Sequence, residues 1–152
     1  MPNRVDVIEV ACRAADLVQA MQRAGLQNVK SKGIETDLVT EADVASEKLL
    51  RAELHALDPA AGFWGEESNV PPHEPTYWLV DPIDGTVNFA HGLAYYAVNI
   101  AFIAHGETVL GVTVQMPWRR IYWAELGKGA FLREPGMEDR RLQVSGAGSL
   151  RT

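Results

Sequence analysis

The chain changes its local pattern at Gly62, and this change limits the folds that it can adopt. From this residue on, short runs of β-branched and aromatic residues alternate with glycine, proline and asparagine, which is typical of strands and turns. The connections between the later runs, at 105–107, 117–120 and 127–129, are short. Parallel strands need long crossovers, so short connections predict antiparallel neighbours. The predicted strands cover residues 62–66, 77–80, 96–104, 108–116, 121–126 and 130–132.

Two amphipathic helices are predicted before these strands. Apolar residues recur at helical spacing from Val5 to Val18, and Gly25 is placed to end this helix with a left-handed cap. A second helix is predicted from about Thr40 to Leu57. Its expected buried stripe consists of Ala45, Leu49, Ala52 and Ala56, widened by Leu50, Leu54 and Leu57. Helices followed by a run of strands favour an α+β fold, in which both helices cover one face of a mostly antiparallel sheet.

Composition excludes several classes of partner. Fourteen Lys and Arg residues face twenty Asp and Glu residues, and the resulting net charge of -6 argues against nucleic-acid binding. Acidic residues near the N-terminus argue against a signal peptide, and no run approaches the ~20 apolar residues of a membrane span. The single cysteine, Cys12, cannot form an internal disulfide and fits a reducing compartment. We therefore expect a cytoplasmic protein that binds neither nucleic acid nor membrane.

The densest group of functional side chains is the run WLVDPIDGT at 78–86, where an apolar strand leads directly into two carboxylates. Pro82 fixes its own φ and biases Asp81 toward extended backbone, so Asp81 and Asp84 should project from a rigid elbow. Carboxylate oxygens on a stiff frame suit Mg²⁺, which completes its coordination with water and substrate phosphate. Taken alone, the same residues also fit a simple turn between strands, because Asp, Pro and Gly all favour turns.

Two further acidic elements lie upstream of this elbow. The run GEES at 65–68 follows the apolar residues Phe63 and Trp64, and it therefore also places carboxylates at the end of a strand. By itself this run fits a solvated loop equally well. The run TEAD at 40–43 has the pattern of a capping box, which would stabilise the second helix by about 1 kcal/mol.

Together these elements resemble the inositol monophosphatase family of magnesium-dependent phosphomonoesterases. The signature of that family stands intact at 78–86, and GEES at 65–68 is similar to its Gly-Glu-Glu metal element. Lys32 and residues 37–43 are similar to its N-terminal active-site stretch. The runs at 127–131 and 142–145 match the end of its first half. The resemblance implies the first half of the αβαβα layered sugar-phosphatase fold and a small phosphorylated metabolite as substrate.

The resemblance also implies two or three Mg²⁺ ions as cofactors. Glu66, Asp81 and the backbone carbonyl of Ile83 would hold the first ion, and Asp81 and Asp84 would share the second. Thr86 would orient the attacking water with support from Asp43, while Glu66 helps to activate that water. The expected substrate contacts are Asp84, Gly85, Thr86 and, as a further candidate, Lys32.

The second half of this family supplies a further metal-binding aspartate in a Trp-Asp context, and no such context follows Thr86 here. We expect residues 1–145 to form the N-terminal metal-binding α+β subdomain, residues 146–152 to be a linker stub, and the C-terminal α/β subdomain to be absent. Hydrolysis by these 152 residues alone should then be poor or absent. The expected partner is a second copy in a homo-oligomer or a complementing C-terminal half.

Two other functions stay open at this point. The chain could be a non-catalytic metal-binding or oligomerisation module that keeps only the carboxylate cluster. Among enzymes, related phosphatases act on fructose 1,6-bisphosphate or on nucleotide bisphosphates. The run VNFAHG at 87–92 looks closer to the inositol monophosphatase branch.

Overall fold

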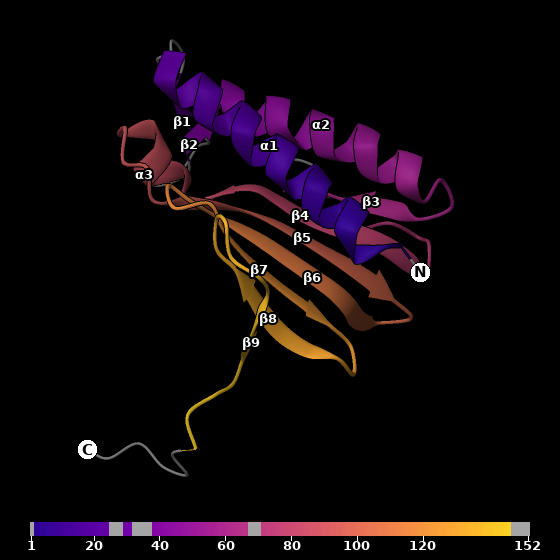
Figure 1. Ribbon diagram of the computed structural model, residues 1–152. Helices are drawn as coiled ribbons and strands as arrows, with labels where there is room; N and C mark the ends of the chain where they lie inside the picture. The colour runs from indigo at the N-terminus through magenta and orange to yellow at the C-terminus, as the bar shows by residue number, and fades with distance from the viewer. Residues whose placement is uncertain (1, 25–28, 32–37, 67–70, 147–152) are drawn as a thin grey trace, which may run out of the picture.

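The computed structural model describes residues 2–24, 29–31, 38–66 and 71–146. Two long helices, α1 (Arg4–Ala24) and α2 (Glu41–Leu57), lie side by side over one face of a seven-stranded sheet (Figure 1). The strands of this sheet are β3 (Gly62–Trp64), β4 (Thr76–Asp84), β5 (Tyr96–Ala104), β6 (Glu107–Met116), β7 (Arg120–Glu125), β8 (Gly129–Arg133) and β9 (Arg140–Leu142). The predicted α+β class is therefore confirmed.

The strands lie in the sheet in the order in which they occur in the chain. All neighbours are antiparallel except β3 and β4, which run parallel across the longer connection between them. The sequence did not predict three elements: β9, the hairpin of β1 (Val29–Ser31) and β2 (Leu38–Thr40), and the short helix α3 (Thr86–Ala90). Strand β4 also continues through the acidic elbow to Asp84, four residues beyond its predicted end at Val80.

The core lies between the helices and the sheet. Side chains on the central strands alternate between buried and half-buried positions, as expected for a sheet that is covered on one face. Trp78, Val98 and Val114 are at most 1% exposed on the side that the helices cover. The Trp78 ring packs against Phe102 with 4.5 Å between ring centroids. No helix in the described part of the chain covers the opposite face, which we call the open face.

The buried stripe predicted for the second helix is wrong in part. Ala52, Ala56 and Leu57 are exposed, whereas Asp43, Ser46 and Glu47 are buried together with Leu50 and Leu54. Exposing an alanine side chain to water costs little free energy, and polar residues can be buried where they find polar partners. The face of α2 that meets β4 is therefore partly polar, and this polar part lies next to the acidic elbow.

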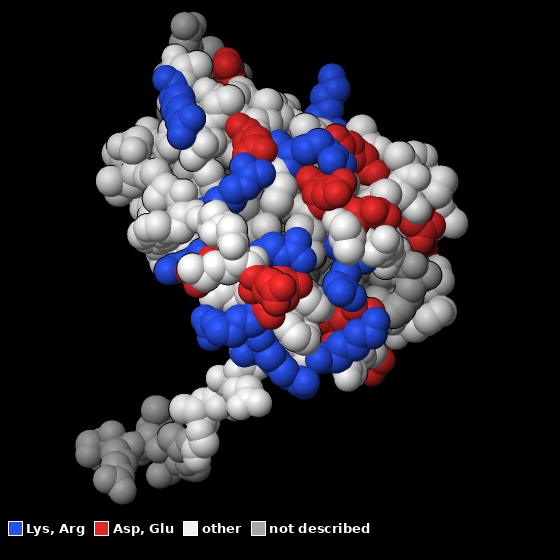
Figure 2. Space-filling model, viewed as in Figure 1, with Lys and Arg blue, Asp and Glu red and all other residues white. Residues whose placement is uncertain are grey.

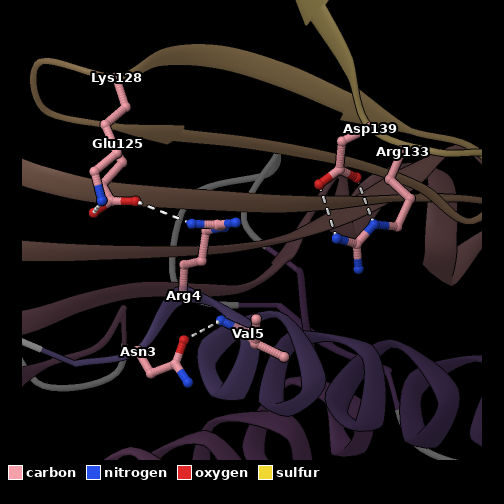
Figure 3. A network of polar contacts seen from close by, with 7 residues as sticks. All are labelled: Asn3, Arg4, Val5, Glu125, Lys128, Arg133 and Asp139. Carbon is pink, nitrogen blue, oxygen red and sulfur yellow. Dashed lines mark hydrogen bonds and ion pairs between the residues drawn. The ribbon is translucent and has the colours of Figure 1, made fainter.

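The N-terminus of α1 contacts strand β7 on the face of the sheet that the helices cover. The Asn3 side chain accepts a hydrogen bond from the Val5 amide at 3.1 Å, which satisfies one free N–H of the first turn. The Arg4 guanidinium lies 3.7 Å from the Glu125 carboxylate (Figure 3). It also lies 4.6 Å from the centroid of the Trp123 ring. These contacts join the first helix to β7, the fifth strand counted from the sheet edge at β3.

Acidic and basic side chains are interspersed over the face shown in Figure 2. Ion pairs join separate segments of the chain: Arg13 of α1 contacts Glu53 of α2 at 2.6 Å, and Arg120 of β7 contacts Glu134, which follows β8, at 2.8 Å. Among the described helices, none combines the length and the apolar character that crossing a bilayer requires.

Candidate active site

The acidic elbow is built on a β-bulge in β4. Asp81 pairs with Asn99 and Asp84 pairs with Ala97, so three steps along β4 oppose two steps along β5. A bulge of this kind bends the strand and redirects its side chains. The Asp81 carboxylate accepts a hydrogen bond from the Ile83 amide at 3.2 Å, which stabilises the local turn. Asp81 is half-buried, whereas Asp84 is exposed at the end of the strand.

The backbone turns sharply after Asp84. Gly85 has a φ of 98°, in the left-handed region that favours glycine, and a Cβ there would lie 3.2 Å from the Tyr95 carbonyl oxygen. The Thr86 hydroxyl donates a hydrogen bond to the Ile83 carbonyl at 2.9 Å. These contacts place the hydroxyl of Thr86 and the carbonyl of Ile83 beside each other at the start of α3.

Helix α2 brings a further carboxylate to the elbow. The Ser46 hydroxyl donates a hydrogen bond to the Pro82 carbonyl at 3.3 Å, and Ser46 is fully buried. Asp43 lies one helical turn before Ser46 and is 3% exposed. Because residues three apart share a helix face, the contact that docks Ser46 also turns Asp43 toward β4.

The loop after β3 supplies Glu66. The preceding residue, Gly65, is buried against Glu47 of α2, and a Cβ on Gly65 would lie 2.4 Å from the Glu47 carboxylate. Glu47 in turn pairs with Arg51 at 3.0 Å, one turn further along the helix. The loop can therefore approach α2 only because residue 65 has no side chain.

The electrostatics of Asp81 show that these carboxylates converge. Burial raises the pKa of the Asp81 carboxyl to about 6, and the nearby charges of Glu66, Asp84 and Asp43 contribute in that order. The hydrogen bond from Ile83 acts in the opposite direction. Three separate elements thus direct acidic side chains at one place, where a negative charge is costly unless a cation balances it.

The donor set fits a hard divalent cation, which prefers oxygen ligands and keeps several waters. Two carboxylates and a backbone carbonyl are available at the elbow, from Asp81, Asp84 and Ile83. Within the described ranges, however, no three Asp, Glu, His or Cys side chains already enclose a common point. The cluster is therefore an incomplete coordination shell, and oxygens of water or substrate would have to supply the remaining ligands.

The structure brings most of the predicted site residues together. Asp43, Glu66 and Asp84 all act on Asp81, and the remaining predicted residues of the elbow adjoin them. Lys32, Asp37, Glu67 and Ser68 lie outside the described residues.

The sequence did not indicate two residues that contact the site. The Asn99 amide donates a hydrogen bond to the Asp84 carboxylate at 3.2 Å, and the Thr113 hydroxyl donates to the Asn99 side-chain oxygen at 2.7 Å. Asn99 is a polar residue within the apolar strand β5, which is an available signal because asparagine is uncommon in strands. Its partners depend on the register between strands.

A hollow of ≈ 290 Å³ opens beside this cluster. It is lined by Asp84, Gly85, Asn88 and Gln115, among others, and so presents carboxylate, amide and backbone groups. The Asn88 amide is held by the Tyr95 carbonyl at 2.9 Å. A polar substrate could therefore reach Asp84 from the open face.

Comparison with known proteins agrees with this geometry. The family model described as "Inositol monophosphatase family" matches residues 3–152. The chain belongs to the inositol monophosphatase family. It is 41% identical to the inositol-1-monophosphatase of Caulobacter vibrioides over 143 residues, which cover 91% of this chain and 54% of that protein. It is 36% identical to inositol monophosphatase 2 of Rattus norvegicus over 144 residues, which cover 91% of this chain and 47% of that protein.

Solved structures show the same relationship. The IMPase of Thermotoga maritima superposes with a TM-score of 0.84 at 30% identity, covering 97% of this chain and 56% of that one. The extragenic suppressor protein SuhB of Bartonella henselae superposes with a TM-score of 0.83 at 33% identity, covering 95% of this chain and 55% of that one. The chain spans about half the length of the inositol monophosphatases that it matches.

Proposed function

We propose that this chain is the metal- and phosphate-binding half of a magnesium-dependent phosphomonoesterase that acts on inositol phosphates. The observation that carries the proposal is the convergence of carboxylates on Asp81, to which Glu66, Asp84 and Asp43 all contribute. The names of the relatives support inositol phosphate as the substrate class. The lone Cys12 supports a reducing cytoplasm as the compartment.

The acidic side chains would hold two or three Mg²⁺ ions. Glu66, Asp81 and the Ile83 carbonyl would bind the first ion, and Asp81 would share the second with Asp84. Bound Mg²⁺ would stabilise the charge that develops on the phosphoryl oxygens and lower the pKa of a coordinated water. The raised pKa of Asp81 supports this assignment, since mutually repelling carboxylates are what a divalent cation neutralises.

The other site residues would orient the reactants. The backbone N–H groups of Gly85 and Thr86 would bind phosphate oxygens, with Asp84 beside them. The Thr86 hydroxyl, supported by the buried Asp43, would hold the attacking water in position. Glu66 lies exposed at the rim of the cluster and would accept a proton from that water. Positioning and charge stabilisation are most of what phosphoryl transfer requires.

Turnover would need more polypeptide than these residues provide. The relatives are about twice as long as the matched region, and the open face of the sheet is the surface left for further chain to cover. A complementing C-terminal half would occupy this face, and a homo-oligomer is the alternative occupant. If neither forms, the cluster would act as a metal-binding module without catalysis.

The test compares the chain with Asp81→Asn in two assays. The first measures phosphate release from inositol 1-phosphate with and without Mg²⁺, and the second measures the rise in the unfolding midpoint Tm on addition of Mg²⁺. We expect a Tm increase for the parent chain that Asp81→Asn abolishes and that Asp6→Asn, the same change in the first turn of α1, leaves intact. An equal Tm increase in Asp81→Asn would refute the proposal. Phosphate release that depends on Asp81 would show that this half alone is catalytic.

A further inference from the structure

A row of polar side chains runs from the acidic elbow across the open face. Asp81 lies opposite Asn99, Asn99 opposite Thr113, and Thr113 opposite Tyr122, on four successive strands. Residues opposite each other in a sheet project to the same face, so these side chains are neighbours. They are half-buried, while their sequence neighbours on β5 and β6, such as Val98, are buried under the helices.

Two hydrogen bonds link this row to Asp84 rather than to Asp81. The Asn99 amide nitrogen donates to Oδ2 of Asp84 at 3.2 Å, and the Thr113 hydroxyl donates to Oδ1 of Asn99 at 2.7 Å. An ionised carboxylate can only accept hydrogen bonds, so the amide must turn its nitrogen toward Asp84. Its oxygen then faces Thr113, whose hydroxyl can donate to it. We call this chain of two hydrogen bonds, from Thr113 through Asn99 to Asp84, the relay. Which group donates and which accepts in each bond follows from the chemistry of the three side chains.

The bulge in β4 makes this contact possible. The extra residue between Asp81 and Asp84 moves Asp84 out of the regular register and brings its carboxylate within reach of Asn99. Asp84 is exposed, so without a partner its side chain would be free to change rotamer. The Asn99 amide engages one oxygen, Oδ2, and leaves Oδ1 available to a ligand.

We propose that Asn99, held by Thr113, is a positioning residue that fixes the Asp84 carboxylate in the orientation needed for cation binding. This inference rests on the proposed function, because it assigns a purpose to the orientation of Asp84. Hydrogen-bonding partners behind a metal ligand typically change metal affinity by about 10–100-fold when they are removed. The two strands β5 and β6 thus take part in the site through side chains that contact no cation themselves.

The test uses Mn²⁺, whose free concentration is measured by electron paramagnetic resonance, as a probe for the Mg²⁺ site. Asn99→Leu keeps the size of the side chain but removes the amide donor, and we expect it to weaken Mn²⁺ binding about tenfold. Thr113→Val keeps the branched shape suited to a strand and removes only the hydroxyl, so a loss of a few-fold is expected. Tyr122→Phe removes a hydroxyl from the same row, which contacts Gln115 rather than Asp84, and should leave binding unchanged. Far-UV circular dichroism without metal checks that each variant is folded.

The outcomes separate this inference from the proposed function. Mn²⁺ binding by the parent that is lost in Asp81→Asn but unchanged in both Asn99→Leu and Thr113→Val would overturn the positioning role alone. An equal loss in Tyr122→Phe would also overturn it, because the effect would then belong to the sheet and not to the relay. A parent chain that binds no Mn²⁺ through Asp81 would overturn the proposed function and the positioning role with it.

Discussion

At the scale of single residues, the folded structure disfavours the ionised form of the Asp81 carboxyl. Its folded-state pKa of about 6 lies above the ordinary value of 3.8, so the folded chain binds this proton more tightly than the unfolded chain does. Stability from this group is present below pH 3.8 and is lost as the pH rises through 6. Without metal, Asp81→Asn should therefore stabilise the fold at pH 7 by about 1 kcal/mol, a value reduced by solvent screening.

Urea unfolding at pH 7 and pH 4 measures this effect. The advantage of Asp81→Asn over the parent should shrink at the lower pH, where the parent carboxyl is largely protonated. Added Mg²⁺ should reverse the order at pH 7 by stabilising only the parent. If Asp81→Asn is less stable than the metal-free parent at pH 7, the raised pKa of Asp81 is contradicted.

Gly65 should tolerate no side chain. Gly65→Ala would place a Cβ 2.4 Å from the Glu47 carboxylate, which is 6% exposed and paired with Arg51. We expect a loss of about 1–3 kcal/mol in the free energy of unfolding, because the buried carboxylate or the loop must move. Gly111→Ala is the matched control, since a Cβ there meets nothing within 4 Å, and it should be neutral or slightly stabilising. Equal effects of the two changes in thermal unfolding would disprove the close approach.

At the scale of elements, the site depends on how α2 meets β4. The buried hydrogen bond from Ser46 to the Pro82 carbonyl joins the helix to the elbow. Ser46→Ala leaves that carbonyl buried without this donor, and we expect a loss of about 1–2 kcal/mol in chemical denaturation. Val44→Ala lies on the exposed side of the same helix, at 54% exposure, and should change stability by less than about 0.5 kcal/mol. If the two losses match, the docking role of Ser46 is wrong.

The positions of helices and strands are easier to predict from the sequence than the identity of the side chains that they bury. Alternating apolar residues place β5 at 96–104, and the structure has the same bounds. Proline and glycine at 82 and 85 are typical of a turn, yet β4 continues to Asp84 because the bulge accommodates Pro82 within the strand. On α2 the burial of Asp43, Ser46 and Glu47 depends on partners in other elements, which hydrophobic periodicity does not encode.

The same limit applies to the candidate site. The motif at 78–86 indicates which carboxylates lie together because they are close in sequence. Asn99 and Thr113 reach Asp84 only through the pairing of β4, β5 and β6, and a shift of one residue in that register would turn their side chains to the other face. The residues that are close in sequence could therefore be predicted. Asn99 and Thr113 could not, because their place in the site depends on the register between strands.

At the scale of the whole molecule, the two faces of the sheet are unequal. The helices cover one face, whereas the open face carries a hollow of ≈ 550 Å³ lined largely by apolar groups, including Leu79, Ala101, Ala130 and Leu142. Contiguous exposed apolar surface can mark an interaction site. The relatives are about twice as long as the matched region, which agrees with a face that further polypeptide covers.

The isolated 152-residue chain should therefore associate with itself through this face. Leu79 is 39% exposed in the hollow, and Leu79→Lys should shift the chain toward monomer in sedimentation velocity, because a charge buried between two apolar faces is costly. Leu93→Lys places the same charge on a leucine that is 57% exposed and does not line the hollow, so it should leave association unchanged. A parent chain that sediments as a monomer at every concentration would show that water is tolerated on the open face. Equal dissociation by both substitutions would place the contact elsewhere on the molecule.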